Sequence, residues 1–458
     1  MDKMKRREFL KIVGLGAASL ALPGCSTGPM QNAAKASGRP NIVIVLCDDM
    51  GYGDLGCFGH PHIKTPNLDK LASEGMKLTD CYAAAAVCSP SRSGMLTGRT
   101  PWRCGIYDWI PAGSAMHLQS KELTIAALLK NSGYATCHCG KWHCNGKFNS
   151  PEQPQPGDHS FEHWFSTQNN AAPTHQNPKN FVRNGEPVGP LEGYSSPLIV
   201  QEAIDWLGTK RDRARPFYLF VCFHAPHEPI ATGPQFMDMY RGKEQAIYYG
   251  NVTQMDYELG RLIKTLDDMT LRDNTFVMFT SDNGPETLNR YRGSNRSFGS
   301  PGPLRGMKLH LYEGGIRVPG IMRWPGKVKP GSLCHEPVNG TDVLPSLCEM
   351  ASVEVPTDRP IDGTSFLPIF RGKQLNRKVP LYWRYNQALS KPFTVAMRQG
   401  DYKIIADNEM TQFELYNLRK DIGERDNLAE KEPQRLAAMK KTLARLHAEI
   451  DAEGPKWD

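Results

Sequence analysis

Four apolar runs, each followed by polar residues, constrain the fold of this chain more than any other feature. The runs cover residues 42–47, 134–139, 217–223 and 275–280. They are rich in β-branched and aromatic residues and do not alternate with polar ones, which is typical of strands covered on both faces of a parallel sheet. We therefore predict that these four segments lie in one buried, mostly parallel sheet.

The residues that follow these runs have chemically active side chains. Asp48 and Asp49 follow the first run, and Asp282 and Asn283 follow the last. Lys141 to His143 and His224 to His227 follow the other two. Because open α/β sheets bind ligands at the carboxyl ends of their strands, we expect these side chains to share one site.

The remaining pattern predicts the fold class. Apolar residues at helical spacing over 252–266 and 123–128 predict helices between the strands, which gives an α/β fold with a large, mixed, mostly parallel central sheet flanked by helices. Short runs after residue 380 predict a small C-terminal antiparallel sheet, covered by a helix over 436–450. We expect a large domain over 39–372 and a small α+β subdomain over 373–458. Residues 150–195 look like an irregular insertion that either shapes a pocket or is a surface excursion.

Residues 88–99 predict a short helix with a special N-terminus. Pro90 suits a first helical turn and Gly98 suits a helix end, so Cys88 should lie at the helix start. Arg92 lies one turn further on the same face, where it can pair with an anion held near Cys88. The simpler alternative is a helix with an unreactive thiol.

This segment, Cys-x-Pro-Ser-Arg followed by Met-Leu-Thr-Gly-Arg, resembles the signature of the type I sulfatases, a branch of the alkaline phosphatase superfamily. The chain is similar to carbohydrate sulfatases of the arylsulfatase A and N-acetylgalactosamine-6-sulfatase kind. The resemblance implies an alkaline phosphatase-like fold and oxidation of Cys88 to formylglycine by a formylglycine-generating or anaerobic maturation enzyme. The hydrated aldehyde would then be the nucleophile of a sulfuric ester hydrolase.

The acids and the amide at the strand ends predict a metal site. Asp48, Asp49, Asp282 and Asn283 offer oxygen ligands alone, which suit Ca²⁺ or Mg²⁺ better than zinc. The resemblance implies that they and residue 88 hold one divalent cation, calcium first and magnesium as the alternative. Taken alone, Asp48 and Asp49 also fit a turn with helix caps. The nearby Cys137, Cys139 and Cys144 lack the spacing of a zinc site.

The resemblance also assigns catalytic roles. The Gly-Lys-Trp-His element implies that Lys141 contacts the sulfate and His143 the nucleophile, and Lys308 matches a further sulfate ligand. With Arg92 and the metal, the two lysines would offset the charge of the transition state. His227, in the His-x-Pro-His segment, would protonate the departing oxygen while a hydroxyl at position 88 attacks sulfur. His143 would then help to expel sulfate and restore the aldehyde.

Substrate identity is predicted from residues that suit sugars and anions. Aromatic rings stack on sugars and arginines pair with sulfate, so we expect a sulfated polysaccharide or oligosaccharide, galactose-based and carrageenan-like, that is desulfated in exo or endo fashion. The candidate substrate residues are Trp102, Arg103, Asp108, Trp109, His175, Arg183, His310, Trp383 and Arg384. The alternatives are a phosphomonoester or phosphonate hydrolase of the same superfamily, or a non-catalytic protein that binds sulfated glycans.

The N-terminus resembles an export signal. Arg6 and Arg7 precede a short apolar run over 12–22, as in a twin-arginine signal for that export machinery, and Cys25 matches a lipoprotein cleavage site. Residues 1–25 are therefore predicted to be a signal and 26–38 a linker. We expect an exported bacterial protein, periplasmic or a cell-surface lipoprotein, that meets the membrane through a lipid anchor on Cys25. The net charge of +7 is dispersed and predicts no nucleic-acid partner.

Overall fold

The strand β1 (Asn41–Asp48) lies in the middle of the large sheet of this computed structural model, which describes residues 38–287 and 298–457. Its parallel neighbours are β7 (Phe217–Pro226) and β8 (Thr275–Ser281). On the far side of β7, β3 (Ala135–Lys141) continues the parallel order. These are the four apolar runs, so the predicted parallel core of the sheet is confirmed.

Alternate residues of β1 pack on opposite faces of the sheet. Ile42 and Ile44 belong to one core cluster, and Val43 and Val45 belong to the other. The first cluster includes α2 (Cys88–Thr97), α3 (Ile125–Asn131) and α8 (Val343–Ala351). The second includes α1 (Pro66–Glu74), α4 (Ser195–Asp205) and α6 (Ala246–Asp268). Burial on both faces explains why the strand needs no polar alternation.

The large sheet is mixed. Its strand order is β10-β2-β9-β8-β1-β7-β3-β4-β5-β6, and β11 pairs with β2. β9 is antiparallel to both β8 and β2. The remaining strands are β2 (Met76–Tyr82), β4 (His163–Thr167), β5 (Val182–Arg183), β6 (Glu186–Pro187), β9 (Arg317–Arg323), β10 (Ser332–Cys334) and β11 (Val338–Asn339). Two short helices, α5 (Pro234–Asp238) and α7 (Glu313–Ile316), lie in its connections.

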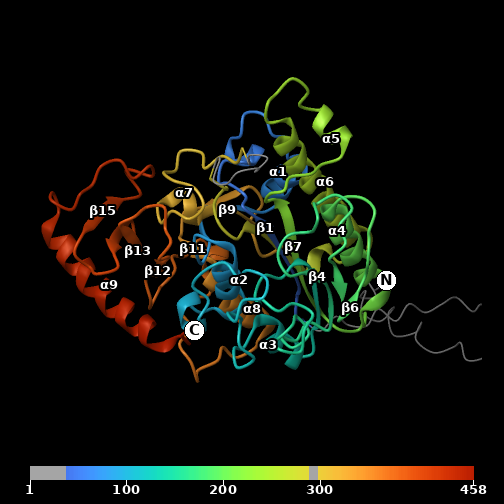
Figure 1. Cartoon of the computed structure of the whole chain (residues 1–458), viewed down its shortest axis with the longest axis horizontal. Helices are drawn as coiled ribbons and strands as arrows, with labels where there is room; N and C mark the ends of the chain where they lie inside the picture. The colour runs from blue at the N-terminus through green and yellow to red at the C-terminus, as the bar shows by residue number, and fades with distance from the viewer. Residues whose placement is uncertain (1–37, 288–297, 458) are drawn as a thin grey trace, which may run out of the picture. The chain divides into compact units, whose positions relative to one another are not determined.

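The C-terminal part forms the predicted antiparallel sheet. Its strands are β12 (Leu381–Arg384), β13 (Phe393–Gln399), β14 (Tyr402–Asp407) and β15 (Phe413–Asn417), paired in that order. The long helix α9 (Pro433–Glu453) buries Met439, Leu443, Leu446 and Ile450 against it (Figure 1). The predicted fold class is thus confirmed, and Gly38–Asp458 cluster as one compact unit.

The segment 150–195 is less irregular than its sequence predicts. β4 (His163–Thr167) is a fully buried strand that pairs in parallel with β3, and β5 and β6 extend this edge of the sheet. The sequence did not predict this strand because polar residues are uncommon in buried strands. Here they are accommodated because they have buried partners. His163 contacts Glu202 at 2.8 Å, and Ser166 contacts His138 at 2.7 Å.

The predicted export signal, Cys25 and the linker up to residue 37 lie outside the described residues. Within 38–287 and 298–457, no helix is both long and apolar enough to cross a bilayer.

Candidate active site

The carboxyl ends of β1 and β8 bring four oxygen-bearing side chains together. Asp48 ends β1 and Asp282 follows β8, its parallel neighbour. The backbone N–H of Asp49 donates to Asp282 Oδ1 at 3.2 Å, and Asn283 Nδ2 donates to Asp49 Oδ1 at 2.7 Å. All four side chains are fully buried or nearly so. The convergence expected from the strand ends is therefore present in the structure.

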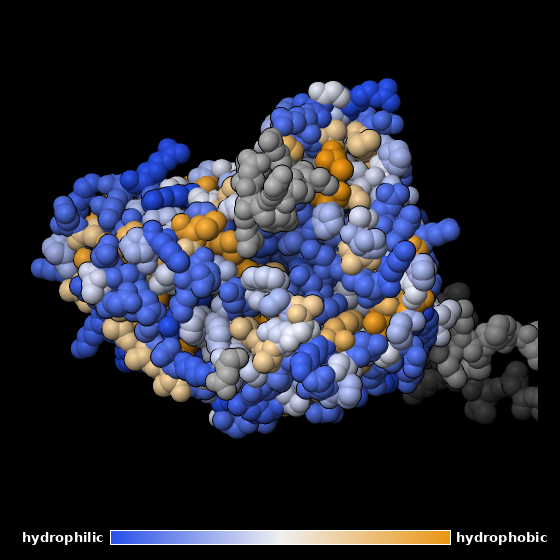
Figure 2. Space-filling model, viewed as in Figure 1, coloured by the Kyte–Doolittle hydropathy of each residue, from blue (hydrophilic) through white to orange (hydrophobic). Residues whose placement is uncertain are grey.

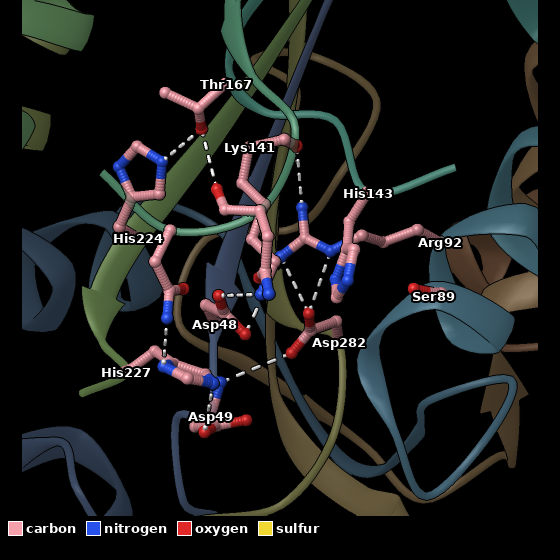
Figure 3. Close-up of polar contacts among 12 residues, drawn as sticks. Asp48, Asp49, Ser89, Arg92, Lys141, His143, Thr167, His224, His227 and Asp282 are labelled. Atoms are coloured by element: carbon pink, nitrogen blue, oxygen red, sulfur yellow. Dashed lines mark hydrogen bonds and ion pairs between the residues drawn. The ribbon is translucent and has the colours of Figure 1, made fainter. Parts of the chain in front are cut away.

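Three cationic side chains hold these carboxylates, and Figure 3 shows two of them, Arg92 and Lys141. Arg92 donates to Asp282 Oδ2 at 2.7 Å through Nη2, and Lys141 Nζ donates to Asp48 Oδ2 at 2.5 Å. Lys308 Nζ donates to Asp49 Oδ2 at 2.7 Å. Buried charges need partners of the opposite sign, and here each of the three aspartates pairs with a different cationic side chain.

The helix α2 places Cys88 at its first position, as its sequence predicts. Gly98 ends the helix with φ +70°, a left-handed conformation that glycine adopts without strain. Arg92, one turn after Cys88, also donates to the carbonyl of Lys141 at 2.9 Å. The same arginine thus connects α2 to the ends of β3 and β8.

Cys88 opens into a cavity of about 320 Å³. Its lining consists of Val87, Cys88, Trp109, His143, Asn169, His227, Glu286 and Lys308. The residues come from distant parts of the chain, and four of them, at positions 88, 143, 227 and 308, are among the six catalytic candidates of the sequence. Asp49 is joined to this cavity by its ion pairs with Lys308 at 2.7 Å and His227 at 3.5 Å, whereas the other two catalytic candidates, Arg92 and Lys141, are not among the lining residues.

Burial governs the electrostatics of the site. It raises the pKa of Asp49 to about 6, although Lys308 opposes the change, and that of Asp282 to about 7 despite Arg92. Burial also acts on Asp48, but the charges of Lys141, Arg92 and Lys308 outweigh it and hold the pKa of Asp48 well below its usual range. Burial raises the pKa of the Cys88 thiol, so an unmodified Cys88 is protonated at neutral pH and is a poor nucleophile.

The acid cluster fits a hard divalent cation. Asp48, Asp49 and His227 offer ligand atoms within 4.8 Å of one another. Asp48 Oδ1 and Asn283 Oδ1 are buried and make no hydrogen bond within the described residues, which leaves two acceptor oxygens available. Four carboxylates, counting Glu286 beside Lys308 at 3.3 Å, face three cationic side chains. A divalent cation together with a singly charged ester would balance these charges.

Two histidines face the cavity. His227 Nε2 lies 3.5 Å from Asp49 Oδ2, while its Nδ1 contacts the Glu228 carbonyl at 2.5 Å and Asn170 Nδ2 at 3.2 Å. Burial and the charge of Lys308 lower the pKa of His227 to about 3. His143 Nε2 contacts the carbonyl of Ile110 at 3.0 Å. Both rings are therefore fixed by backbone contacts and are neutral in this state.

Of the nine candidate substrate residues, all of which the structure describes, Trp109 lines this cavity. Its neighbour Asp108 accepts a hydrogen bond from Tyr385 at 3.0 Å. His175 is buried, with its ring centroid 5.3 Å from that of His224. His310 bonds through Nδ1 to the carbonyl of Met307 at 3.0 Å.

The other five do not line this cavity and have contacts within the protein. Arg183 pairs with Glu202 at 2.6 Å at the edge of the sheet. Arg103 pairs with Asp362 at 3.0 Å, and Arg384 stacks on Trp102 with 3.7 Å between guanidinium carbon and ring centroid. Trp383 donates through Nε1 to the carbonyl of Ala83 at 2.8 Å. Arginine and tryptophan suit sugars, but here they satisfy buried acids, carbonyls and rings, which the sequence pattern does not reveal.

Sequence reasoning missed several residues near the cavity. Glu286 lines it, and its signal was its place in the polar turn that begins with Asp282. Asn169 lines it and Asn170 contacts His227, but both lie in the segment interpreted as an irregular insertion. Val87 carries no chemical signal and is recognisable from its position alone.

This fold and this site define a class of enzyme: a sulfuric ester hydrolase of the alkaline phosphatase-like fold. A family model described as "Sulfatase" matches residues 40–353, and one described as "N-sulphoglucosamine sulphohydrolase, C-terminal" matches residues 307–452. The chain therefore belongs to the sulfatase family, as its motifs predicted.

Individual relatives agree with this assignment. The N-acetylgalactosamine-6-sulfatase of Canis lupus familiaris is 33% identical over 395 residues, which cover 81% of this chain and 72% of the relative. Arylsulfatase A of Homo sapiens is 33% identical over 470 residues, covering 90% and 88%. The crystal structure of Ps i-CgsB in complex with k-i-k-neocarrahexaose superposes with a TM-score of 0.78 at 26% identity, covering 90% of this chain and 98% of that one.

Proposed function

We propose that this protein is an exported, formylglycine-dependent carbohydrate sulfatase whose nucleophile is made from Cys88. One observation carries the proposal: Cys88 lies at the start of α2 in a cavity shared with His143, His227 and Lys308. The high pKa of the buried thiol argues against an unmodified cysteine as nucleophile. A formylglycine at this position would supply an aldehyde hydrate whose hydroxyl can attack sulfur.

Asp48, Asp49, Asp282 and Asn283 would hold the divalent cation. Their oxygen donors suit both Ca²⁺ and Mg²⁺, and the resemblance to the family makes Ca²⁺ the first choice. When bound, the cation would polarise the sulfate oxygens and stabilise negative charge at position 88. Asp48 Oδ1 and Asn283 Oδ1, which accept no hydrogen bond within the described residues, support this site. Addition of Ca²⁺ should therefore raise the melting temperature, and Asn283→Leu should abolish that rise while a control variant, Asn376→Leu, retains it.

The chain's own residues position the ester. Lys308 Nζ donates to Asp49 at 2.7 Å, and Lys141 Nζ donates to Asp48 at 2.5 Å. A sulfate group bound between these two ammonium groups would contact both. His227 would carry the proton for the departing oxygen, and the sulfate charge would offset the Lys308 charge that disfavours the imidazolium. His143, whose Nε2 contacts the Ile110 carbonyl, would take the proton of the second hydroxyl at position 88, and sulfate would leave as the aldehyde forms again.

The proposed substrate is a sulfated polysaccharide or oligosaccharide. Ps i-CgsB, whose structure superposes on this chain, is described with a bound neocarrahexaose, which supports a galactose-based, carrageenan-like ligand here as well. Trp109, exposed at the cavity, supplies a ring on which a sugar can stack. Desulfation of carrageenan, ulvan, fucoidan and glycosaminoglycan oligosaccharides, compared side by side, tests this class.

The nucleophile is tested by mass spectrometry of the peptide that contains position 88, after expression with a formylglycine-generating enzyme. Conversion removes about 18 Da, because one oxygen replaces a sulfur and two hydrogens. The matured enzyme should hydrolyse aryl sulfates, and Cys88→Ala should not, whereas Cys348→Ala in α8 should retain activity. A peptide without this mass loss would support the non-catalytic glycan-binding alternative, in which position 88 stays unmodified.

The second alternative, a phosphomonoester or phosphonate hydrolase, makes a different prediction. A phosphate monoester carries more negative charge than a sulfate ester, and the site already contains Glu286 beside Lys308. We expect aryl sulfate to be preferred over aryl phosphate and phosphonate in direct competition. A preference for either phosphorus ester would overturn the sulfatase proposal.

The proposed export route rests on residues 1–25. Replacement of Arg6 and Arg7 by lysines should retain the protein in the cytoplasm if the twin-arginine machinery exports it. Replacement of Cys25 by alanine should release the exported protein from the membrane fraction if a lipid on Cys25 anchors it.

A further inference from the structure

Trp109, which lines the cavity, and Leu389, whose backbone is bonded to the residue after the cavity residue Lys308, are both exposed to solvent. Trp109 is 41% exposed and Leu389 is 52% exposed. Isolated apolar residues on a surface are common and need no explanation, as the scattered orange residues in Figure 2 show. These two differ because hydrogen bonds join the loops that carry them to each other and to a residue next to the cavity.

The loop between β12 and β13 is fixed against the cavity by hydrogen bonds. Leu389 donates from its backbone N–H to the carbonyl of Leu309 at 2.9 Å, and Leu309 follows the cavity residue Lys308. At its start, Tyr385 donates to Asp108 at 3.0 Å, next to Trp109. Each exposed side chain thus belongs to a loop with a direct contact to the other side of the site.

The same loop also packs in a buried cluster with the nucleophile position. Tyr385 and Ala388 belong to one buried cluster with Val87, Cys88 and Leu309. Leu309 is itself tied to the helix start by a hydrogen bond from its N–H to the Ala86 carbonyl at 2.9 Å. The backbone of Leu389 is therefore held close to Lys308 and to the start of α2 through Leu309.

The size of the cavity limits how much of a substrate it can hold. A cavity of about 320 Å³ is at the lower end of the range for ligand pockets. It must hold the sulfate group, between Lys308 and His227, and the sugar ring that carries it. A further sugar unit joined to that ring would lie outside the cavity, against the exposed side chains.

From this geometry we infer that Trp109 and Leu389 form a subsite for the sugar unit linked to the sulfated one. The occupant is a pyranose ring, whose apolar C–H face matches an aromatic ring on one side and a leucine on the other. The C-terminal sheet thereby contributes to the choice of substrate. This inference rests on the proposed function, because it assumes a sulfated oligosaccharide.

The test compares three substrates of the matured enzyme: an aryl sulfate, a monosaccharide sulfate and a sulfated carrageenan oligosaccharide. Trp109 lines the cavity as well as the proposed subsite, so Leu389 is the sharper probe. Leu389→Ala should lower kcat/KM on the oligosaccharide about tenfold, through KM, the change expected when an apolar side chain loses a contact worth about 1.4 kcal/mol. The aryl and monosaccharide sulfates should change less than twofold.

Leu333→Ala is the matched control, because Leu333 is also 52% exposed and lies in β10 at the edge of the large sheet. Its kinetics should equal those of the wild type on all three substrates. An equal change on all substrates with Leu389→Ala, or none on the oligosaccharide, would overturn the subsite. Wild-type turnover of the monosaccharide as efficient as that of the oligosaccharide would overturn it too. If the matured wild-type enzyme did not hydrolyse the aryl sulfate, the proposed function itself would be overturned.

Discussion

Lys308 is the residue on which the charge of the cavity depends most directly. It pairs with Asp49 at 2.7 Å and with Glu286 at 3.3 Å, and it faces the nucleophile position. Lys308→Met keeps the length of the side chain but removes its charge, so we expect kcat/KM on an aryl sulfate to fall about 10²- to 10³-fold, as for loss of one group that stabilises a transition state.

The control for this variant is Lys327→Met, because Lys327 is an exposed lysine in the turn after β9. It should retain full activity. If Lys308→Met retained more than a tenth of the wild-type kcat/KM while folding normally, Lys308 would not contact the sulfate.

Gly140 lies near the end of β3, where it pairs with Ser166 of β4 and Cys222 of β7. Its φ is +108°, and a Cβ at this position would lie 1.8 Å from the carbonyl oxygen of Cys222. Lys141 is the next residue of the strand, so a shift of the backbone at position 140 would also move this catalytic candidate. Gly140→Ala combines backbone strain with a steric clash, and we expect it to lower the free energy of unfolding by about 3 kcal/mol or more and to reduce activity.

Gly185→Ala separates these two effects. Gly185 also has a positive φ, +93°, but a Cβ there meets nothing within 4 Å. It should cost about 1 kcal/mol from strain alone, measured by urea unfolding of both variants. Equal losses would show that contact with β7 is not what requires glycine at position 140.

The elements of the sheet were predictable to the extent that their signals were local. Continuous apolar runs predicted four parallel strands, and the polar residues after them predicted that Asp48 and Asp282 lie close together. β4 was not predictable, because His163 and Ser166 look unfavourable in a buried strand until Glu202 and His138 are known as their partners. Such pairings depend on residues far apart in the sequence.

Glu202 of α4 joins the helix layer to this edge of the sheet, and its charge predicts a pH dependence. Burial would raise its pKa, but hydrogen bonds from His163, Arg183 and Lys210 hold it well below the usual range. Because the folded pKa is depressed, its contribution to stability is complete above the unfolded value of about 4.3 and is lost as the pH falls below it.

Glu202→Gln should therefore destabilise the protein by about 1 to 2 kcal/mol at pH 7 and by less at pH 4. This range is discounted for the exposure of Arg183 and Lys210, 40% and 36%. Glu186→Gln, at an exposed residue of β6, is the control and should have no effect at either pH. Unfolding curves at the two pH values measure the difference, and a gap that widened toward pH 4 would contradict the assignment.

At the scale of the whole molecule, the small sheet is joined to the large one by buried charges. Lys403 of β14 pairs with Glu313 of α7 at 3.0 Å and with Glu424 at 2.9 Å, and none of these side chains is exposed. Glu313 also accepts a hydrogen bond from Tyr82 of β2 at 2.5 Å. This arrangement could not be inferred from the sequence, where the four residues look like unrelated surface charges and an ordinary tyrosine.

Removal of one partner from such a group leaves the others buried without compensation. Lys403→Met should lower the free energy of unfolding by about 3 to 5 kcal/mol. Burial already raises the pKa of Glu424 to about 7, so Glu424→Gln removes the less favourable of the two acids. The double variant Lys403→Met, Glu424→Gln should accordingly be more stable than Lys403→Met alone.

Urea unfolding of the wild type, both single variants and the double variant measures this coupling, with Lys441→Met on the exposed face of α9 as the neutral control. Activity provides a second measurement, because the small sheet packs against Val87 and Cys88. In Lys403→Met the oligosaccharide activity should fall further than the aryl sulfate activity, since the displaced sheet carries Leu389 but not the sulfate ligands. Equal stability of Lys403→Met and the wild type would mean that apolar packing alone joins the two sheets.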